Sequence, residues 1–221
     1  MDLSISVLEL LGVLFSGGGL LCSLATTLMS TWRIQTTNLL STENIEWGLW
    51  ETCVIREMLE CKPYDTLLGL SSDIKLARIF MCTALGVGIL GLLLAIPGLR
   101  LVNGCSRRQL EDLSCKRALK ATAGVLCLIA GILVLIPVSY IAHTTVEQFF
   151  DESLPELAPR WELGDALFCG WTGGLFYLVA GTLLLISCLQ LQKLDSNRPV
   201  HVSLVPVKPE PHFVRTKSEY V

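Results

Sequence analysis

Four long apolar runs limit this chain to folds that cross a membrane. They cover residues 7–29, 79–99, 121–142 and 166–189. An α-helix rises ~1.5 Å per residue, so roughly 20 apolar residues span the ~30 Å hydrocarbon core of a bilayer. A soluble domain of 221 residues could not bury four such helices. We therefore expect four transmembrane helices, the first retained rather than cleaved as a signal peptide, because no basic residue precedes it.

The charge content excludes several classes of protein. Charged residues make up only 17% of the chain, against ~25% in soluble domains, and the net charge is −3. A nucleic-acid binder needs a basic face, which this composition does not provide. The runs carry no cluster of acids, histidines or lysines and no nucleophile beside a base, so we expect no enzyme and no cofactor or metal site. Glu9, near the start of the first run, is expected at the level of the lipid headgroups.

The distribution of Lys and Arg predicts the orientation. The segment between the second and third runs holds six basic residues, whereas that between the third and fourth holds one base and six acids. Because loops rich in Lys and Arg stay in the cytoplasm, both termini are expected there. The cytoplasmic segments are then 1–6, 100–120 and 190–221, and the extracellular ones are 30–78 and 143–165.

Glycines in the second to fourth runs predict that the helices pack closely, because small residues let helix backbones approach one another in lipid. These residues are Gly86, Gly88, Gly91, Gly124, Gly131, Gly170 and Gly174. The sequence therefore predicts a close-packed bundle of four helices.

The long extracellular segment combines two cysteines with strand-like stretches. Of nine cysteines, only Cys53 and Cys61 lie in an extracellular segment, where we expect them to form a disulfide. Two free thiols or a metal pair is the alternative, weakened because this segment contains no histidine. Residues 32–37 and 49–55 are rich in aromatic and β-branched residues, which is typical of strands. The run Ser71-Ser72-Asp73 offers an N-cap for the helix that follows.

A group of residues in this segment resembles the signature of the claudins, the four-span strand-forming proteins of tight junctions. The signature positions are Trp47, Gly48, Leu49 and Trp50, followed by Cys53 and Cys61, with Trp32 before them and Arg78 after them. The resemblance implies an α+β membrane protein, in which a small extracellular antiparallel sheet of about five strands stands on a left-handed bundle of four transmembrane helices.

The resemblance also implies a function. Such a protein polymerises with itself and other claudins, within one membrane and between cells, to form a paracellular barrier or an ion-selective channel in the tight junction of the plasma membrane. The expected adhesion contacts are Leu67, Leu68, Leu70, Phe149 and Phe150. The alternative is a related four-span protein that serves as an auxiliary subunit of an ion channel.

The charges near the two cysteines leave the sign of any ion selectivity open. Only seven residues separate the cysteines, fewer than is usual in the family, which shortens the hairpin expected to line a pore. Basic Arg56 and Lys62 stand among acidic Glu57, Glu60 and Asp65. Side chains that line a narrow aqueous gap can select ions by charge, but a mixed solvated rim is an equal alternative.

The cytoplasmic tail suggests further partners. It is rich in proline and is expected to be flexible, and it ends in Tyr220-Val221, an ending that suits capture of the carboxylate by a PDZ-domain scaffold protein. Cys105 and Cys188 lie near the membrane, where S-palmitoylation would anchor them in lipid. An inert reduced thiol is an equal alternative for each cysteine.

Overall fold

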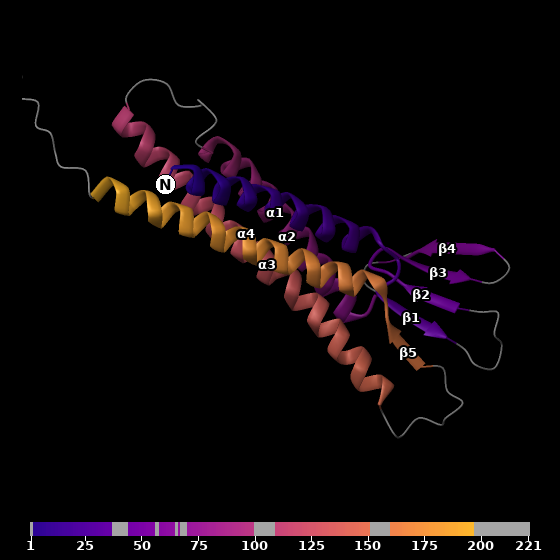
Figure 1. The fold of residues 1–221 in the computed structure, drawn as a ribbon. Helices are drawn as coiled ribbons and strands as arrows, with labels where there is room; N and C mark the ends of the chain where they lie inside the picture. The colour runs from indigo at the N-terminus through magenta and orange to yellow at the C-terminus, as the bar shows by residue number, and fades with distance from the viewer. Residues whose placement is uncertain are drawn as a thin grey trace, which may run out of the picture.

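The computed structural model describes residues 2–36, 44–55, 58–64, 66, 70–99, 109–150 and 160–196. The chain forms an elongated bundle of helices with a sheet at one end (Figure 1). The helices are α1 (Asp2–Leu28), α2 (Ser72–Gly98), α3 (Gln109–Phe149) and α4 (Asp165–Ser196). Each contains a segment long and apolar enough to cross a membrane, which confirms the four-span prediction.

The helices extend beyond the apolar runs. α2 begins at Ser72 rather than residue 79, and α3 runs from Gln109 to Phe149 rather than from residue 121 to 142. Hydropathy detects the part of a helix that lies in hydrocarbon, whereas backbone hydrogen bonds continue into the polar ends. Ser71 is the N-cap of α2, as expected, but its side chain makes no capping bond, and its carbonyl accepts from the amide of Lys75 at 3.2 Å.

Four-helix packing follows a seven-residue repeat. α4 packs between α1 and α3, α2 packs on the other side of α3, and α1 and α3 lie diagonally across the bundle with few direct contacts. Seven residues are slightly fewer than two helical turns, so helices that keep this spacing wind around one another in a left-handed supercoil. The buried positions that follow it are Glu9, Ser16 and Ser23 on α1, Lys120, Cys127 and Val134 on α3, and Gly173, Ala180 and Ser187 on α4.

Facing glycines bring α3 and α4 into backbone contact. A Cβ at Gly131 would lie 3.0 Å from the carbonyl oxygen of Gly174. A Cβ at Gly181 would lie 2.8 Å from that of Gly124. Close packing was therefore correctly predicted for Gly124, Gly131 and Gly174, whereas Gly181 was not predicted. Gly86 has nothing within 4 Å of its Cβ site and does not contribute to close packing.

The sheet has five antiparallel strands in the order β4-β3-β2-β1-β5. The strands are β1 (Arg33–Thr36), β2 (Asn44–Trp47), β3 (Glu51–Ile55), β4 (Leu59–Pro63) and β5 (Arg160–Leu163). The predicted strands 32–37 and 49–55 correspond to β1 and β3. β5 comes from the segment between α3 and α4 and pairs with β1 from the segment between α1 and α2, so both segments build one sheet (Figure 1).

Candidate functional site

Two tryptophan side chains cap the C-terminal end of α1. The last carbonyls of a helix have no donor within the helix. Here the indole N–H of Trp32 donates to the carbonyl of Thr26 at 2.8 Å, and that of Trp50 donates to the carbonyl of Thr27 at 2.9 Å. Trp32 is 3% exposed. The indoles therefore satisfy the end of α1 and fix the sheet to it.

Arg78 ties α2 to the turn between β2 and β3. Its Nε donates to the carbonyl of Leu49 at 2.7 Å, and its guanidinium carbon lies 4.8 Å from the ring centroid of Trp50 and 5.4 Å from that of Tyr64. The Tyr64 hydroxyl donates to the carbonyl of Gly48 at 3.1 Å. The signature residues thus form one connected cluster, which we call the signature cluster: Trp32, Trp47, Gly48, Leu49, Trp50, Tyr64 and Arg78.

Two glycines allow the chain to cross itself at this cluster. A Cβ at Gly48 would lie 2.6 Å from the Cα of Ser30, and one at Gly164 would lie 1.9 Å from the carbonyl oxygen of Thr31. The amide of Gly164 donates to the carbonyl of Trp32 at 3.2 Å. Neither glycine has a positive φ. These positions need glycine for space rather than for backbone conformation, which the sequence pattern did not reveal.

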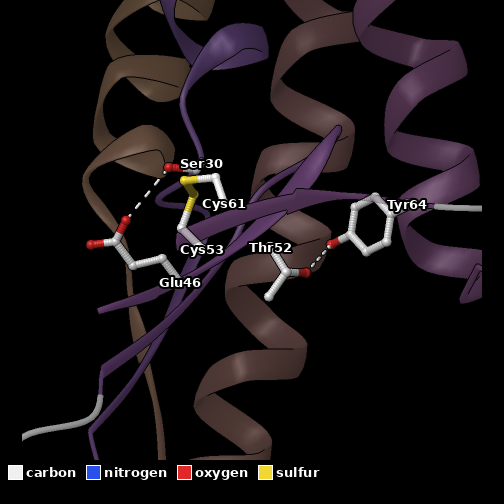
Figure 2. The surroundings of a disulfide bond; sticks show 6 residues. All are labelled: Ser30, Glu46, Thr52, Cys53, Cys61 and Tyr64. Carbon is white, nitrogen blue, oxygen red and sulfur yellow. Dashed lines mark hydrogen bonds between the residues drawn. A yellow bond between two sulfur atoms is a disulfide. The ribbon is translucent and has the colours of Figure 1, made fainter. Parts of the chain in front are cut away.

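The disulfide joins Cys53 and Cys61, as predicted (Figure 2). The two residues face each other in the register of β3 and β4. The carboxylate of Glu51 lies near both sulfur atoms, but bonded sulfurs offer no thiolate to a metal, so the metal-pair alternative is wrong. The bond closes the short hairpin at the edge of the sheet.

Arg33 joins the sheet to α2 and α3, and the motif analysis missed it. Its Nη2 donates to the hydroxyl of Thr144 at 2.5 Å. Burial lowers the pKa of Arg33, and the nearby Asp73 carboxylate and Tyr140 partly offset this shift. Arginine keeps its charge under these conditions. The available sequence signal for Arg33 was its position directly after Trp32, at the point where the chain enters the sheet.

Arg160 joins the start of β5 to the end of α3. Its guanidinium donates to the carbonyl of Phe149 at 2.9 Å and lies 5.4 Å from the centroid of that ring. A cation suits the negative end of a helix dipole, here the end of α3. Phe149 and Phe150 pack edge to face at 5.3 Å, and Phe150 is 72% exposed. Phe150 is therefore presented to solvent beside the sheet, and the half-buried Phe149 packs against it.

Charges of both signs lie on the edge strand. Glu60 and Lys62 are exposed on β4 and point to the same face of the sheet, because alternate residues of a strand share a face. In the register, Lys62 stands beside Thr52 and Trp47, on the opposite face from the disulfide. Because these two side chains carry opposite charges on one face, they would act in opposite directions on an ion that passes within a few ångströms.

Two predicted site residues lie in unexpected places. Leu70 is buried, so it is not presented for adhesion. Cys188 is buried, and its thiol donates to the carbonyl of Arg117 at 3.6 Å, so it faces α3 rather than lipid and is not placed for acylation. Outside the described residues lie Arg56, Glu57, Asp65, Leu67, Leu68, Cys105, Tyr220 and Val221.

Replacing Arg78 tests the energetic role of the signature cluster. Arg78→Ala removes one charged hydrogen bond and two cation–π contacts, so we expect a loss of about 2 kcal/mol in stability. That loss corresponds to a melting temperature lower by about 4–8 °C for a chain of this size. Arg78→Lys keeps the charge but not the planar group and should fall between. Thermal melting of the purified protein in detergent measures both, and a wild-type melting temperature for Arg78→Ala would contradict the assignment.

Comparison with known proteins identifies relatives over most of the chain. Residues 6–184 match the model of the PMP-22/EMP/MP20/Claudin family. Mouse Claudin-8 is 32% identical over 97% of this chain and 98% of its own length. Human Claudin-3 is 34% identical over 84% of both chains, and human Claudin-4 is 32% identical over 82% of this chain and 86% of its own.

Proposed function

The chain belongs to the PMP-22/EMP/MP20/Claudin family, and on that premise we propose that it polymerises into tight-junction strands. Its claudin relatives and its four candidate spans support a multi-pass membrane protein of tight junctions. In the proposed strands it associates with copies of itself and with other claudins, side by side in one membrane and across to the neighbouring cell. The strands form a paracellular barrier or an ion-selective channel.

The observation that carries this proposal is the anchoring of the described strands of both segments to the bundle. The signature cluster ties the first segment to α1 and α2, and β5 together with Arg160 ties the second to β1 and α3. A surface that must meet a second molecule repeatedly along a strand gains from such preorganisation, because less conformational entropy is lost on contact. An auxiliary channel subunit, the second candidate, shares the signature but lacks a reason for the exposed aromatic pair.

Adhesion between cells is proposed to use Phe150 with its neighbour Phe149. Exposed aromatic side chains with few rotamers are effective contact residues. Leu67 and Leu68 of the first segment remain predicted contacts. The proposed orientation places both termini in the cytoplasm, where Tyr220-Val221 would meet PDZ scaffolds and Cys105 could be acylated.

Ion selectivity is proposed to follow from the edge strand β4. A charge that lines a narrow gap acts on passing ions within the Debye length of ~8 Å. If Lys62 faces the gap, the strand disfavours cations, and if Glu60 faces it, the strand disfavours anions. Arg56, Glu57 and Asp65 contribute with their own signs in the same way.

Charge reversal on β4 should change the permeability ratio of Na⁺ to Cl⁻. One unit charge at 4 Å in water is worth about 1 kcal/mol, or about fivefold for one ion. Lys62→Glu changes the charge by two units and acts in opposite directions on Na⁺ and Cl⁻, so we expect it to raise this ratio by at least about fivefold. Glu60→Lys should lower it by a similar factor. Dilution potentials across an epithelial layer give the ratio. Equal ratios in wild type and both variants would show that β4 does not line the ion path.

Expression in epithelial cells that lack strands of their own tests the function itself. We expect continuous strands at cell contacts and a changed transepithelial resistance. Protein that reaches the cell surface without strands or any electrical change would contradict the proposal and favour the auxiliary-subunit candidate. Coexpression with a strand-forming claudin is the control for a member that needs a partner.

A further inference from the structure

A buried ion pair crosses the bundle at the end opposite the sheet. The ammonium group of Lys120 on α3 donates to the carboxylate of Glu9 on α1, and the hydroxyl of Ser187 on α4 donates to the same oxygen at 3.2 Å. Glu9 and Lys120 are each 1% exposed. Glu9 therefore points into the bundle, contrary to the expectation that it meets lipid headgroups. Three helices meet at these three side chains.

Both charges lie within the candidate spans. Glu9 belongs to the span Ser6–Leu28, and Lys120 belongs to the span Lys116–Phe149. A charge in hydrocarbon is costly and persists when it is paired. Removing one member of a buried pair leaves the other uncompensated, whereas replacing both is often tolerated. The pair therefore constrains how α1 can lie against α3.

The same register recurs along the diagonal of the bundle. Seven residues further on, the hydroxyl of Ser16 lies 3.5 Å from the sulfur of Cys127. At the other end, beyond the end of α1, Arg33 of β1 bonds Thr144 of α3 and so joins the sheet, rather than α1, to α3. Each of these contacts, like Glu9 with Lys120, joins residues 111 positions apart in the sequence. α1 and α3 make few other contacts, so apolar packing between these two helices does little to fix their register.

We propose that the Glu9–Lys120 pair, completed by Ser187, fixes the register of α1 against α3 and so the height at which α1 meets the sheet. A slip of one helical turn, ~5.4 Å, would separate the charges and leave both buried without each other. The observed register keeps the two charges in contact. The far end of α1 then meets the signature cluster at a fixed height along the bundle axis.

A cross-link between α1 and α3 reports this register directly. Ser16→Cys places a thiol beside Cys127, and Leu20→Cys places one a turn further along α1. Oxidation of the full-length protein in membranes, followed by mass spectrometry of its peptides, measures the fraction of each cysteine joined to Cys127. We expect the wild-type register to cross-link Ser16→Cys and not Leu20→Cys.

The charges are then changed singly and together. Glu9→Gln or Lys120→Met should lower the Ser16→Cys cross-link at least fivefold, and the exchange Glu9→Lys with Lys120→Glu should restore at least half of it. Thr122→Val is the control, because this hydroxyl is exposed on α3 and bonds only carbonyls of its own helix among the described contacts. Unchanged cross-linking in both single variants would overturn the proposal, and so would an exchange variant that cross-links no better than the single ones.

Melting of the purified proteins gives a second readout that does not depend on cysteines. The double neutral variant, Glu9→Gln with Lys120→Met, should melt closer to wild type than either single variant does. Losses that simply add in the double variant would show that the two side chains act independently, which also overturns the proposal. Neither readout depends on strand formation, so a failure here is distinguishable from a failure of the proposed function.

Discussion

Gly164→Ala is expected to prevent most of the protein from reaching the cell surface. The added methyl group would lie 1.9 Å from the carbonyl oxygen of Thr31, which is backbone and cannot rotate away. Relief requires separating β5 from the start of β1, which breaks the bond from the Gly164 amide to the Trp32 carbonyl. Overpacking costs 1–3 kcal/mol or more, and with no flexible neighbour here we expect about 3 kcal/mol or more.

The control for this variant is Gly17→Ala, because a Cβ at Gly17 meets nothing within 4 Å. In a helix, alanine is favoured over glycine, so this variant should be as stable as wild type or slightly more so. Surface biotinylation gives the fraction of each protein that is delivered, and thermal melting gives its stability. Equal delivery of the two variants would show that the strand crossing at Gly164 can relax.

Cys53→Ser is expected to disorder the extracellular sheet and abolish cell–cell contact while leaving four helices in the membrane. Loss of a disulfide from a small extracellular unit costs about 2–5 kcal/mol. β4 is an edge strand whose residues are all exposed, so the disulfide to β3 is its main side-chain anchor among the described contacts. Limited proteolysis from the outside should cut the variant between β3 and β4.

The matched control is Cys82→Ser, which changes an exposed free thiol on α2. This variant should aggregate cells and resist protease as the wild type does. Cell aggregation in a line without endogenous junction proteins is the functional measurement. Wild-type aggregation by Cys53→Ser would show that the hydrogen bonds of the sheet hold the adhesive surface without the disulfide.

The parts of the fold that were predictable are those with local signals. Hydropathy alone predicts the four helices, β-branched and aromatic residues predict β1 and β3, and compartment predicts the Cys53–Cys61 bond. β2, β4 and β5 are strands of four or five residues that include charged residues. Whether these segments form strands depends more on pairing with neighbouring strands than on their composition.

The parts that were missed depend on contacts between distant residues. Lys120 was assigned to the end of a loop because a lysine terminates an apolar run, yet Glu9 accepts its charge inside the bundle. The need for glycine at position 164 depends on where Thr31 passes. Leu70 was assigned to adhesion by the resemblance to claudins and Cys188 to acylation by its place near the membrane, whereas their exposure is set by the residues packed around them.

The length of α3 has a mechanical consequence. With 41 residues it is about 60 Å long, twice the thickness of the bilayer core, and a single helix that contains Pro137 joins Lys120 to Phe149. Proline has no backbone N–H, so one hydrogen bond of the helix is missing there. Arg160 bonds the Phe149 end of this helix, and Glu9 bonds Lys120 near the other end. A pull exerted on the aromatic tip by an adhering cell would therefore travel along one helix to the other end of the bundle without passing through a loop.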